Sequence, residues 1–259
     1  MTIFIVWALS HGPATTLEAV GAIVGTGILA FLSVLARVLT PPAASVAAAF
    51  GIIIVLLGGV PYLALLVLFV VGSSLATRFR FQEKRARKVS EGSTGERGVS
   101  NVLAHIIIPL AIVAGASQAG PSLAPLAPFV YTSALACGAA DTFASEFGVL
   151  SGSAVSILNG APVPPGTNGG VSLYGEWWAL VGSGSTALLA WGFFQFSFQP
   201  FPTDPALWLL GGTALGWVGC QVDSLLGATL ENRGYIGKGA TNFLAMLIAS
   251  LLAVGLFLR

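Results

Sequence analysis

The stretch LAPFVYTSALACGAA, residues 126–140, runs directly into DTFASEFGVLSG, residues 141–152, and this junction decides how the chain is interpreted. The first part is an apolar run typical of a helix in lipid, whereas the second contains two carboxylates, Asp141 and Glu146. A bilayer disfavours an ionised Asp near a helix centre by about 3 kcal/mol on insertion scales. Carboxylates kept in such a position usually serve a cation, a proton or a polar substrate. The junction therefore indicates both a membrane fold and a functional site.

The composition of the whole chain is that of a membrane protein. Of its 259 residues, 55% are apolar and 8% are charged, and the mean hydropathy is +0.88. An ordinary globular domain has about 25% charged residues. Several apolar runs reach or approach the ~20 residues that a helix needs to cross the hydrocarbon core. We therefore predict an all-α fold: one polytopic integral membrane domain over residues 1–259, with about seven or eight transmembrane helices, some short or broken.

Charge and cysteine content exclude other classes. The formal net charge of +1 argues against a nucleic-acid partner, because such proteins carry a strongly basic surface. Cys137 and Cys220 are lone cysteines inside apolar runs without a CxxC or His-rich partner, so we interpret them as small buried side chains. Membrane lipids are the expected surroundings, and the sequence leaves the oligomeric state open.

Basic residues define the expected topology. With eight spans, only Arg259 of the eleven Lys and Arg residues falls on the side opposite to the others, as the positive-inside rule favours. Many of them lie in the charged loop 78–100, which we expect to be largely solvated and cytoplasmic. The expected spans are residues 17–38, 43–58, 60–77, 101–117, 125–140, 171–194, 205–222 and 240–258. The polar segments placed at the inner face, cytoplasmic or stromal, are Asp141, loop 159–170, Asp223 and loop 231–241.

The spacing of the acidic residues separates their expected roles. In a helix, Asp141 and Ser145 share a face, whereas Asp141 and Glu146 lie roughly 140° apart around the axis. Asp141 is therefore the better metal ligand, and Glu146 is a supporting ligand or base. Asp223 ends the seventh span and is a second candidate ligand. The structural alternatives are a satisfied intramembrane carboxylate for the first pair and an N-cap for Asp223.

A loop rich in Pro and Gly precedes the sixth span. It reads NGAPVPPGTNGGVSLYG over residues 159–175. The backbone amides at Gly166, Gly169 and Gly170 are candidates to bind an anion, and the helix starting near Val171 adds its partial positive charge. No GK[ST] follows, so this is not a Walker A motif. The loop is thus either a phosphate cradle or a simple turn between helices.

Polar residues at other span ends complete the candidate set. The inner loop after the seventh span supplies Arg233, Lys238 and, at the start of the last span, Asn242. Asn101 and His105 are four apart and share a helix face. His105 shows no partner in the sequence, so a packed, hydrogen-bonded histidine is favoured over a catalytic one.

Together these motifs resemble the family of integral membrane proteins that includes phytyl-phosphate kinase and transmembrane protein 19. They occur in family order over residues 72–244. The motifs are GSSLATRF at Gly72, ADTFASEFGVLS at Ala140, VPPGTNGGVSLYG at Val163, DSLLGATLE at Asp223 and TNFL at Thr241. The resemblance implies a kinase that transfers the terminal phosphoryl group of a nucleoside triphosphate, with CTP favoured, to a prenyl monophosphate such as phytyl phosphate. Such a step belongs to tocopherol biosynthesis and chlorophyll salvage.

The resemblance also implies roles for individual residues. Mg²⁺ would be held by Asp141 and Asp223 with Glu146 in support, and Lys238 would offset charge with Arg233. The prenyl chain would lie between helices. The residues implied in nucleotide and phosphate binding are Ser145, Pro165, Gly166, Thr167, Asn168, Gly169, Gly170, Arg233 and Asn242. One departure concerns Asn101 and His105, which stand where the family pattern has Gln and Asn.

Two other functional classes remain open. A lipid cytidylyltransferase or a prenol kinase would handle the same nucleotide and lipid at a similar Asp-containing site. A secondary transporter also uses intramembrane carboxylates and helices broken by Gly and Pro. Transporter sites lie near the bilayer midplane, whereas these motifs gather at one face. The kinase is therefore the preferred interpretation.

Overall fold

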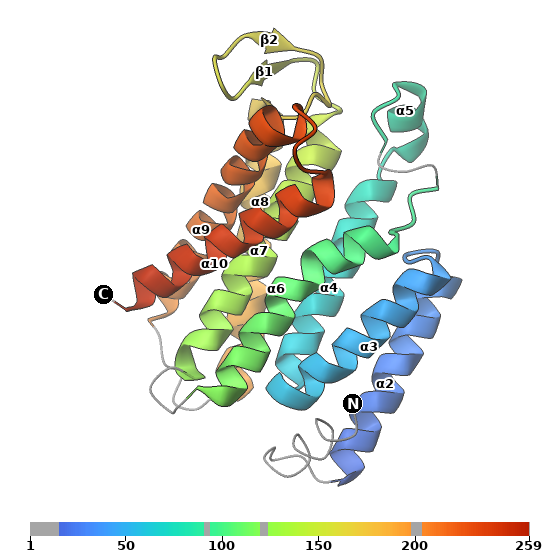
Figure 1. Cartoon of the computed structure of the whole chain (residues 1–259), viewed down its shortest axis with the longest axis vertical. Coiled ribbons are helices and arrows are strands. Elements are labelled where there is room, and N and C mark those ends of the chain that lie inside the picture. Colours follow the sequence, from blue (N-terminus) through green and yellow to red (C-terminus); the bar gives the residue numbers. More distant parts are fainter. Residues whose placement is uncertain (1–15, 91–93, 120–123, 198–203, 259) are drawn as a thin grey trace.

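The computed structural model describes residues 16–90, 94–119, 124–197 and 204–258, and these residues are almost entirely helical (Figure 1). Eight helices in the described residues have 18 residues or more. They are α2 (Thr16–Leu35), α3 (Pro41–Gly58), α4 (Val60–Arg78), α6 (Val99–Gln118), α7 (Ala127–Gly148), α8 (Leu173–Ser197), α9 (Pro205–Leu226) and α10 (Lys238–Phe257). The smaller elements are α5 (Phe81–Ala86), the 3₁₀ turn η1 (Ala124–Leu126), the π-helical turn η2 (Gly227–Glu231) and strands β1 (Ala154–Ser156), β2 (Pro162–Val163) and β3 (Gly170–Val171).

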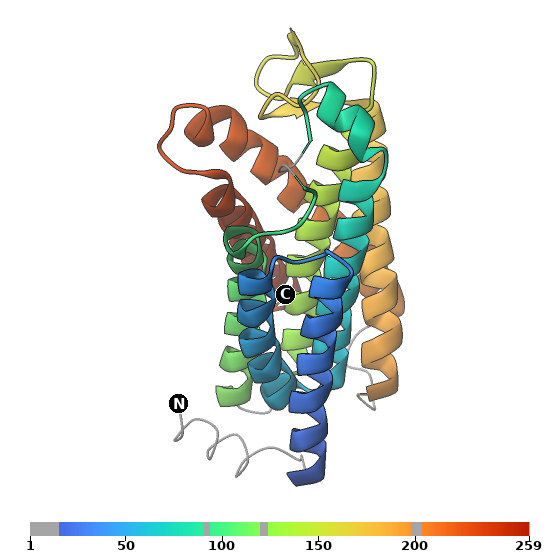
Figure 2. The ribbon, with the colours of Figure 1, turned by 90° about the vertical axis from the view of Figure 1, so that its right-hand side faces the viewer.

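The predicted helical membrane fold is confirmed. Each of the eight expected spans corresponds to one long helix. By length and composition, α3, α4, α6 and α10 are apolar enough to cross a membrane, and Ala19–Leu35 of α2 is a shorter apolar helix. The helices lie side by side in both views (Figures 1 and 2).

The two helices that contain Asp141 and Asp223 end later than the apolar pattern predicts. We expected the fifth span to end at Ala140 and the seventh at Val222, but α7 continues to Gly148 and α9 to Leu226. The apolar run marks only the hydrophobic part of each helix, whereas the helical hydrogen bonds continue through the polar residues that follow. Asp141 therefore lies about 10 Å along the axis before the end of α7, given a rise of about 1.5 Å per residue.

The polar connections gather at one end of the helices, which we call the polar end. Figure 1 shows α5, the strands and the turn between η2 and α10 at this end. The loop between α2 and α3 is joined there to the segment before α6 by a parallel bridge between Leu39 and Arg97. The arrangement agrees with the one-sided distribution of basic residues expected from the sequence. Arg259, placed on the opposite side, lies outside the described residues.

The central helix is α7. Its residues from Ala127 to Ala140 are all buried, as expected for a helix that is apolar on every side. Glycines of the neighbouring helices allow close approach, because a Cβ at Gly216 would lie 2.7 Å from the Ala136 Cβ, and one at Gly219 would lie 2.5 Å from the Cys137 Sγ. The close approach at these two glycines fixes the register of α7 against α9. Cys137 is buried and free, as is Cys220, which confirms the sequence interpretation.

The segment between α7 and α8 folds into a small antiparallel sheet with β1 in the centre. Ala154 pairs with Val163 of β2, and Val155 pairs with Val171 of β3. The sheet holds both ends of the Pro/Gly-rich loop, so that the loop returns to the start of α8. Ser172 caps that helix, since its hydroxyl accepts a hydrogen bond from the Gly175 amide at 3.0 Å.

Candidate functional site

A cavity of about 340 Å³ opens at the polar end between α7, α8, α9 and the Pro/Gly-rich loop. We call it the carboxylate cavity, because five acidic side chains line it. They are Asp141, Glu146, Glu176, Asp223 and Glu231. Other lining residues are Ser145, Pro165, Gly166, Thr167, Asn168, Gly169, Gly170 and Lys238. Most residues that the sequence nominates, though far apart in the chain, therefore meet in one place.

Asp141 of α7 and Asp223 of α9 face the same space. Both line the carboxylate cavity, and the charge of Asp223 interacts with those of Asp141, Lys238 and Glu231. The amide of Asn242 supports Asp223, because its nitrogen, in the orientation that satisfies both groups, lies 3.0 Å from Asp223 Oδ1. Two neighbouring carboxylates repel each other unless a cation lies between them. This pair is thus a candidate divalent cation site.

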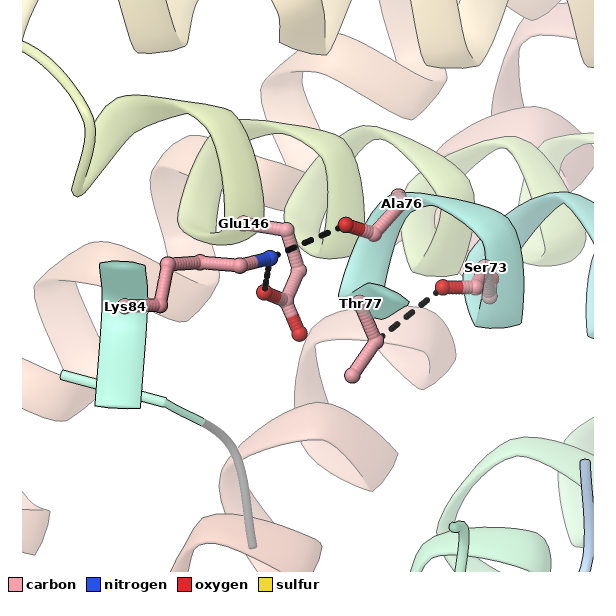
Figure 3. A network of polar contacts seen from close by, with 5 residues as sticks. All are labelled: Ser73, Ala76, Thr77, Lys84 and Glu146. Atoms are coloured by element: carbon pink, nitrogen blue, oxygen red, sulfur yellow. Dashed lines mark hydrogen bonds and ion pairs between the residues drawn. The ribbon is translucent and has the colours of Figure 1, made fainter. Parts of the chain in front are cut away.

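Glu146 forms a buried ion pair with Lys84 (Figure 3). Its Oε2 lies 2.5 Å from the Nζ of Lys84 on α5, and that amine also donates to the Ala76 carbonyl at 3.0 Å. Lys84 is fully buried, whereas we expected the charged loop 78–100 to be largely solvated. A buried charge needs a close partner of opposite sign, so each side chain holds the other in place. Thr77 and Ser73 in the same view belong to α4, whose last turn packs beside the pair.

The predicted three-carboxylate metal group does not form. Within the described ranges, no set of three or more His, Cys, Asp and Glu side chains could hold a metal ion. The reason is the angle between Asp141 and Glu146 around α7, together with the pairing of Glu146 with Lys84. Mg²⁺ is commonly bound by one or two carboxylates together with substrate phosphates and water. The Asp141 and Asp223 pair fits that requirement without Glu146.

The Pro/Gly-rich loop packs tightly against η2. Gly169 has a φ of +74°, and a Cβ there would lie 2.3 Å from the Ala228 Cβ. The loop amides of Thr167 and Gly170 donate to the Pro164 and Thr167 carbonyls at 3.2 and 2.8 Å. Of the three candidate amides of the phosphate cradle, that of Gly170 is therefore used within the loop. The glycines serve close packing as well as any contact with an anion.

Side chains tie the loop to α10 through Glu231. Its Oε1 accepts a hydrogen bond from Asn168 Nδ2 at 3.1 Å, and its Oε2 accepts one from Thr241 Oγ1 at 3.0 Å. The π-helical turn η2 places Glu231 for both contacts, and such turns are frequent at functional sites. The three motifs that contain Asn168, Glu231 and Thr241 thus form one connected structure.

Two acidic residues were missed by the sequence reasoning. Glu176 lines the carboxylate cavity from the first turn of α8, and its Oε2 accepts hydrogen bonds from Trp217 Nε1 at 2.6 Å and Gln221 Nε2 at 2.9 Å. Glu231 ends the DSLLGATLE motif. Their positions next to predicted site segments were the available signal. Lys238 is the only Lys or Arg among the described lining residues, so the cavity is strongly acidic.

Comparison with known proteins identifies the family. Residues 24–249 match the family described as integral membrane protein DUF92. The chain belongs to this family. It is 30% identical over 205 residues to an uncharacterized membrane protein of Methanocaldococcus jannaschii, with 79% of each chain covered. It is 29% identical over 224 residues to an uncharacterized membrane protein of Synechocystis, covering 85% of this chain and 83% of the relative.

A plant relative is also similar. Protein PGR of Arabidopsis thaliana is 31% identical over 192 residues, which cover 68% of this chain and 67% of the plant protein. No solved structure matches. The matched region includes every segment of the carboxylate cavity, so the site lies in the part of the chain that defines the DUF92 family.

Two nominated residues of this DUF92 protein lie outside the carboxylate cavity. Arg233 is exposed in the turn after η2 and is not among the lining residues. Asn242 lines two neighbouring openings and lies between Asp223 and His105, whose Nε2 is 3.3 Å from the Asn242 amide nitrogen in the other amide orientation. The Nδ1 of His105 is 2.8 Å from the Asn101 carbonyl oxygen. His105 is thus the hydrogen-bonded histidine that the sequence favoured.

Proposed function

We propose that this DUF92 protein is a membrane kinase that transfers the terminal phosphoryl group of a nucleoside triphosphate, with CTP favoured, to a prenyl monophosphate such as phytyl phosphate. The observation that carries the proposal is the carboxylate cavity, where the Asp141 and Asp223 pair, Lys238 and the Pro/Gly-rich loop meet at the polar end. The product would be the prenyl diphosphate.

The chemistry of the cavity supports this reaction. Phosphoryl transfer depends on positioning and on neutralising charge on the phosphate oxygens. Asp141 and Asp223 would hold Mg²⁺, which supplies that neutralisation when bound. Lys238 adds a positive charge at the rim, where its side chain is exposed. The acceptor is already a phosphate oxygen, so the reaction needs no strong base, and the pairing of Glu146 with Lys84 is compatible with it.

The position of the cavity also supports the proposal. A soluble nucleotide and a lipid phosphate would meet where the helices leave the bilayer, and the Pro/Gly-rich loop that lines the cavity belongs to the polar end. Three of the five motifs shared with the phytyl-phosphate kinase family contribute to its lining. They are the motifs that begin at Ala140, Val163 and Asp223.

Purified protein in detergent provides the test. It would be incubated with Mg²⁺, a panel of nucleoside triphosphates and phytyl or geranylgeranyl monophosphate, and both lipid and nucleotide products would be analysed. We expect a prenyl diphosphate and CDP. Release of pyrophosphate would instead indicate a cytidylyltransferase, and phosphorylation of the free alcohol would indicate a prenol kinase. Flux of a labelled substrate in proteoliposomes without nucleotide would replace the proposal by a transporter.

A pair of matched variants connects activity to the site. Asp141→Asn should lower the transfer rate by about 10³-fold or more, since losing a metal ligand removes several kcal/mol of transition-state stabilisation. Asp204→Asn is the control, because Asp204 caps the far end of α9 through a 2.8 Å bond from the Ala206 amide and Asn caps helices equally well. Full activity in the Asp141 variant would refute the proposal.

A further inference from the structure

A second cavity, of about 260 Å³, lies between α2, α3, α4 and α6, away from the carboxylate cavity. We call it the chain pocket. Most of its lining is aliphatic, from residues such as Leu29, Ala47 and Val67. Its two small hydroxyl side chains, Thr26 and Ser33, donate hydrogen bonds to carbonyls of their own helix at 2.7 and 2.6 Å. They need no polar partner from the pocket, so the pocket suits hydrocarbon.

One end of the chain pocket is cationic. Arg97 lines it and is only 6% exposed. The backbone of Arg97 is fixed by the bridge to the α2–α3 loop, with hydrogen bonds of 3.0 Å to the Val38 carbonyl and 3.1 Å from the Thr40 amide. Its Nη1 donates to Asn101 Oδ1 at 2.8 Å. A guanidinium held in this way matches the geometry of a phosphate group.

Shared residues connect the chain pocket to the carboxylate cavity. A third cavity, of about 270 Å³, has Arg97 and Asn101 in common with the chain pocket. The same third cavity has Lys238 in common with the carboxylate cavity. An apolar space, two cationic side chains and the carboxylate pair thus follow one another in order.

We propose that the chain pocket binds the hydrocarbon chain of a single-chain lipid monophosphate, and that Arg97 binds its phosphate on the side leading to Lys238. This assignment rests on the proposed function, and it identifies where the acceptor lies. Burial of the chain supplies affinity in proportion to its apolar surface. The guanidinium of Arg97 donates hydrogen bonds to the phosphate and directs it toward Lys238 and the Asp141 and Asp223 pair.

Binding without nucleotide tests the assignment independently of catalysis. The probe is radiolabelled geranylgeranyl monophosphate, retained on the full-length protein in detergent. Ala47→Phe fills the chain pocket and should raise the Kd by about 10-fold or more, since each 1.4 kcal/mol is tenfold in affinity. The matched control is Ala49→Phe, the same change two residues on at an exposed position of α3 that does not line the pocket, and it should leave the Kd within about twofold. Equal effects of the two changes would overturn the assignment.

A second pair of variants tests the contact between Arg97 and the phosphate. Arg97→Gln should weaken monophosphate binding by about 10- to 100-fold, the range for a charge-assisted hydrogen bond, and should leave geranylgeraniol binding nearly unchanged. Equal loss for the alcohol would show that Arg97 acts only on the fold. The control Arg85→Gln alters an exposed cation of α5 that lines none of these cavities.

Photolabelling of the unmodified protein keeps the proposal testable if a variant misfolds. A geranylgeranyl monophosphate with a diazirine at the chain end should label α2, α3, α4 or α6, and labelling confined to α8 and α9 would overturn the assignment. Competition by an excess of phosphatidate would assign the pocket to ordinary membrane lipid. Labelling in the pocket without any phosphoryl transfer would retain this assignment and reject the proposed function.

Discussion

The carboxylate cavity and the chain pocket are similar in size, about 340 and 260 Å³, but opposite in chemistry. Five acidic side chains and a Pro/Gly-rich loop line the first, whereas aliphatic side chains line most of the second. Charge is concentrated between α7, α8 and α9, where hydrogen bonds and an ion pair compensate it. The cavity suited to hydrocarbon lies between α2, α3, α4 and α6. A protein that joins a soluble phosphate donor to a lipid needs both environments, each protected from the other.

The largest effect should follow from removing a charge in the carboxylate cavity. Asp223→Asn keeps an oxygen that can accept the hydrogen bond from Asn242, so the fold should persist. Transfer should fall by about 10³-fold or more with the loss of a metal ligand. Because Asp141 and Asp223 repel each other, the variant without Mg²⁺ should be at least as stable as the parent protein.

Thermal unfolding with and without Mg²⁺ measures the stability of the two proteins and their response to the cation. A ligand that binds only the folded state stabilises it by RT ln(1 + [L]/Kd), so the Tm rises with the logarithm of the ligand concentration once this exceeds the Kd. We therefore expect Mg²⁺ to raise the Tm of the parent protein and to leave that of Asp223→Asn unchanged. An equal Mg²⁺ response in both proteins would show that the cation binds elsewhere.

The second largest effect concerns the ion pair that borders the carboxylate cavity. Lys84→Met leaves Glu146 buried without its partner, which should destabilise the fold by about 3–5 kcal/mol. The control is Arg85→Gln at the exposed neighbouring position of α5, where we expect less than about 0.5 kcal/mol. Unfolding by denaturant in detergent compares the two variants.

A double variant distinguishes loss of the Lys84–Glu146 ion pair from a general disruption of α5. Lys84→Met combined with Glu146→Leu replaces both charges by apolar groups and should recover most of the lost stability. No recovery would mean that α5 needs the charge of Lys84 for another contact. Transfer activity in the double variant would show whether Glu146 has any role beyond holding α5 against α7.

The lining of the carboxylate cavity could be predicted largely from the sequence, whereas that of the chain pocket could not. Polar residues such as Asp141 and Asp223 stand out in apolar runs, and their placement at span ends brings them to one face. The spans themselves follow from hydropathy because a bilayer requires internally satisfied helices. The chain pocket leaves no such signal, since a leucine that lines a pocket resembles one that faces lipid.

Contacts across long separations were also invisible. Lys84 and Glu146 are 62 residues apart, and helical periodicity relates only residues of one helix. In the sequence, Lys84 is one of many cations in a charged loop, and only the packing of α5 against α4 and α7 reveals its burial. The role of Glu231 depends likewise on the π-helical turn, which no sequence pattern indicated.

A moderate effect should come from the loop that covers the carboxylate cavity. Gly169→Ala places a methyl group against Ala228 and strains a residue with positive φ, so it should destabilise the protein by about 2–3 kcal/mol. Gly160→Ala is the control: its φ is +70°, but nothing lies within 4 Å of the added Cβ. It should cost only the backbone strain, about 1 kcal/mol. Equal destabilisation by the two changes would show that contact with η2 is unimportant.

The smallest effect distinguishes two cations that the sequence grouped together. Lys238 lines the carboxylate cavity and the cavity that leads to Arg97, whereas Arg233 is exposed and lines neither. Because Lys238 is itself exposed to water, Lys238→Met should lower kcat/KM by only about 10-fold. Arg233→Gln should change it by less than about twofold. The ratio of the two losses tests whether transfer depends on a charge at the junction of the cavities, and a larger loss for Arg233 would move the phosphate path toward the turn after η2.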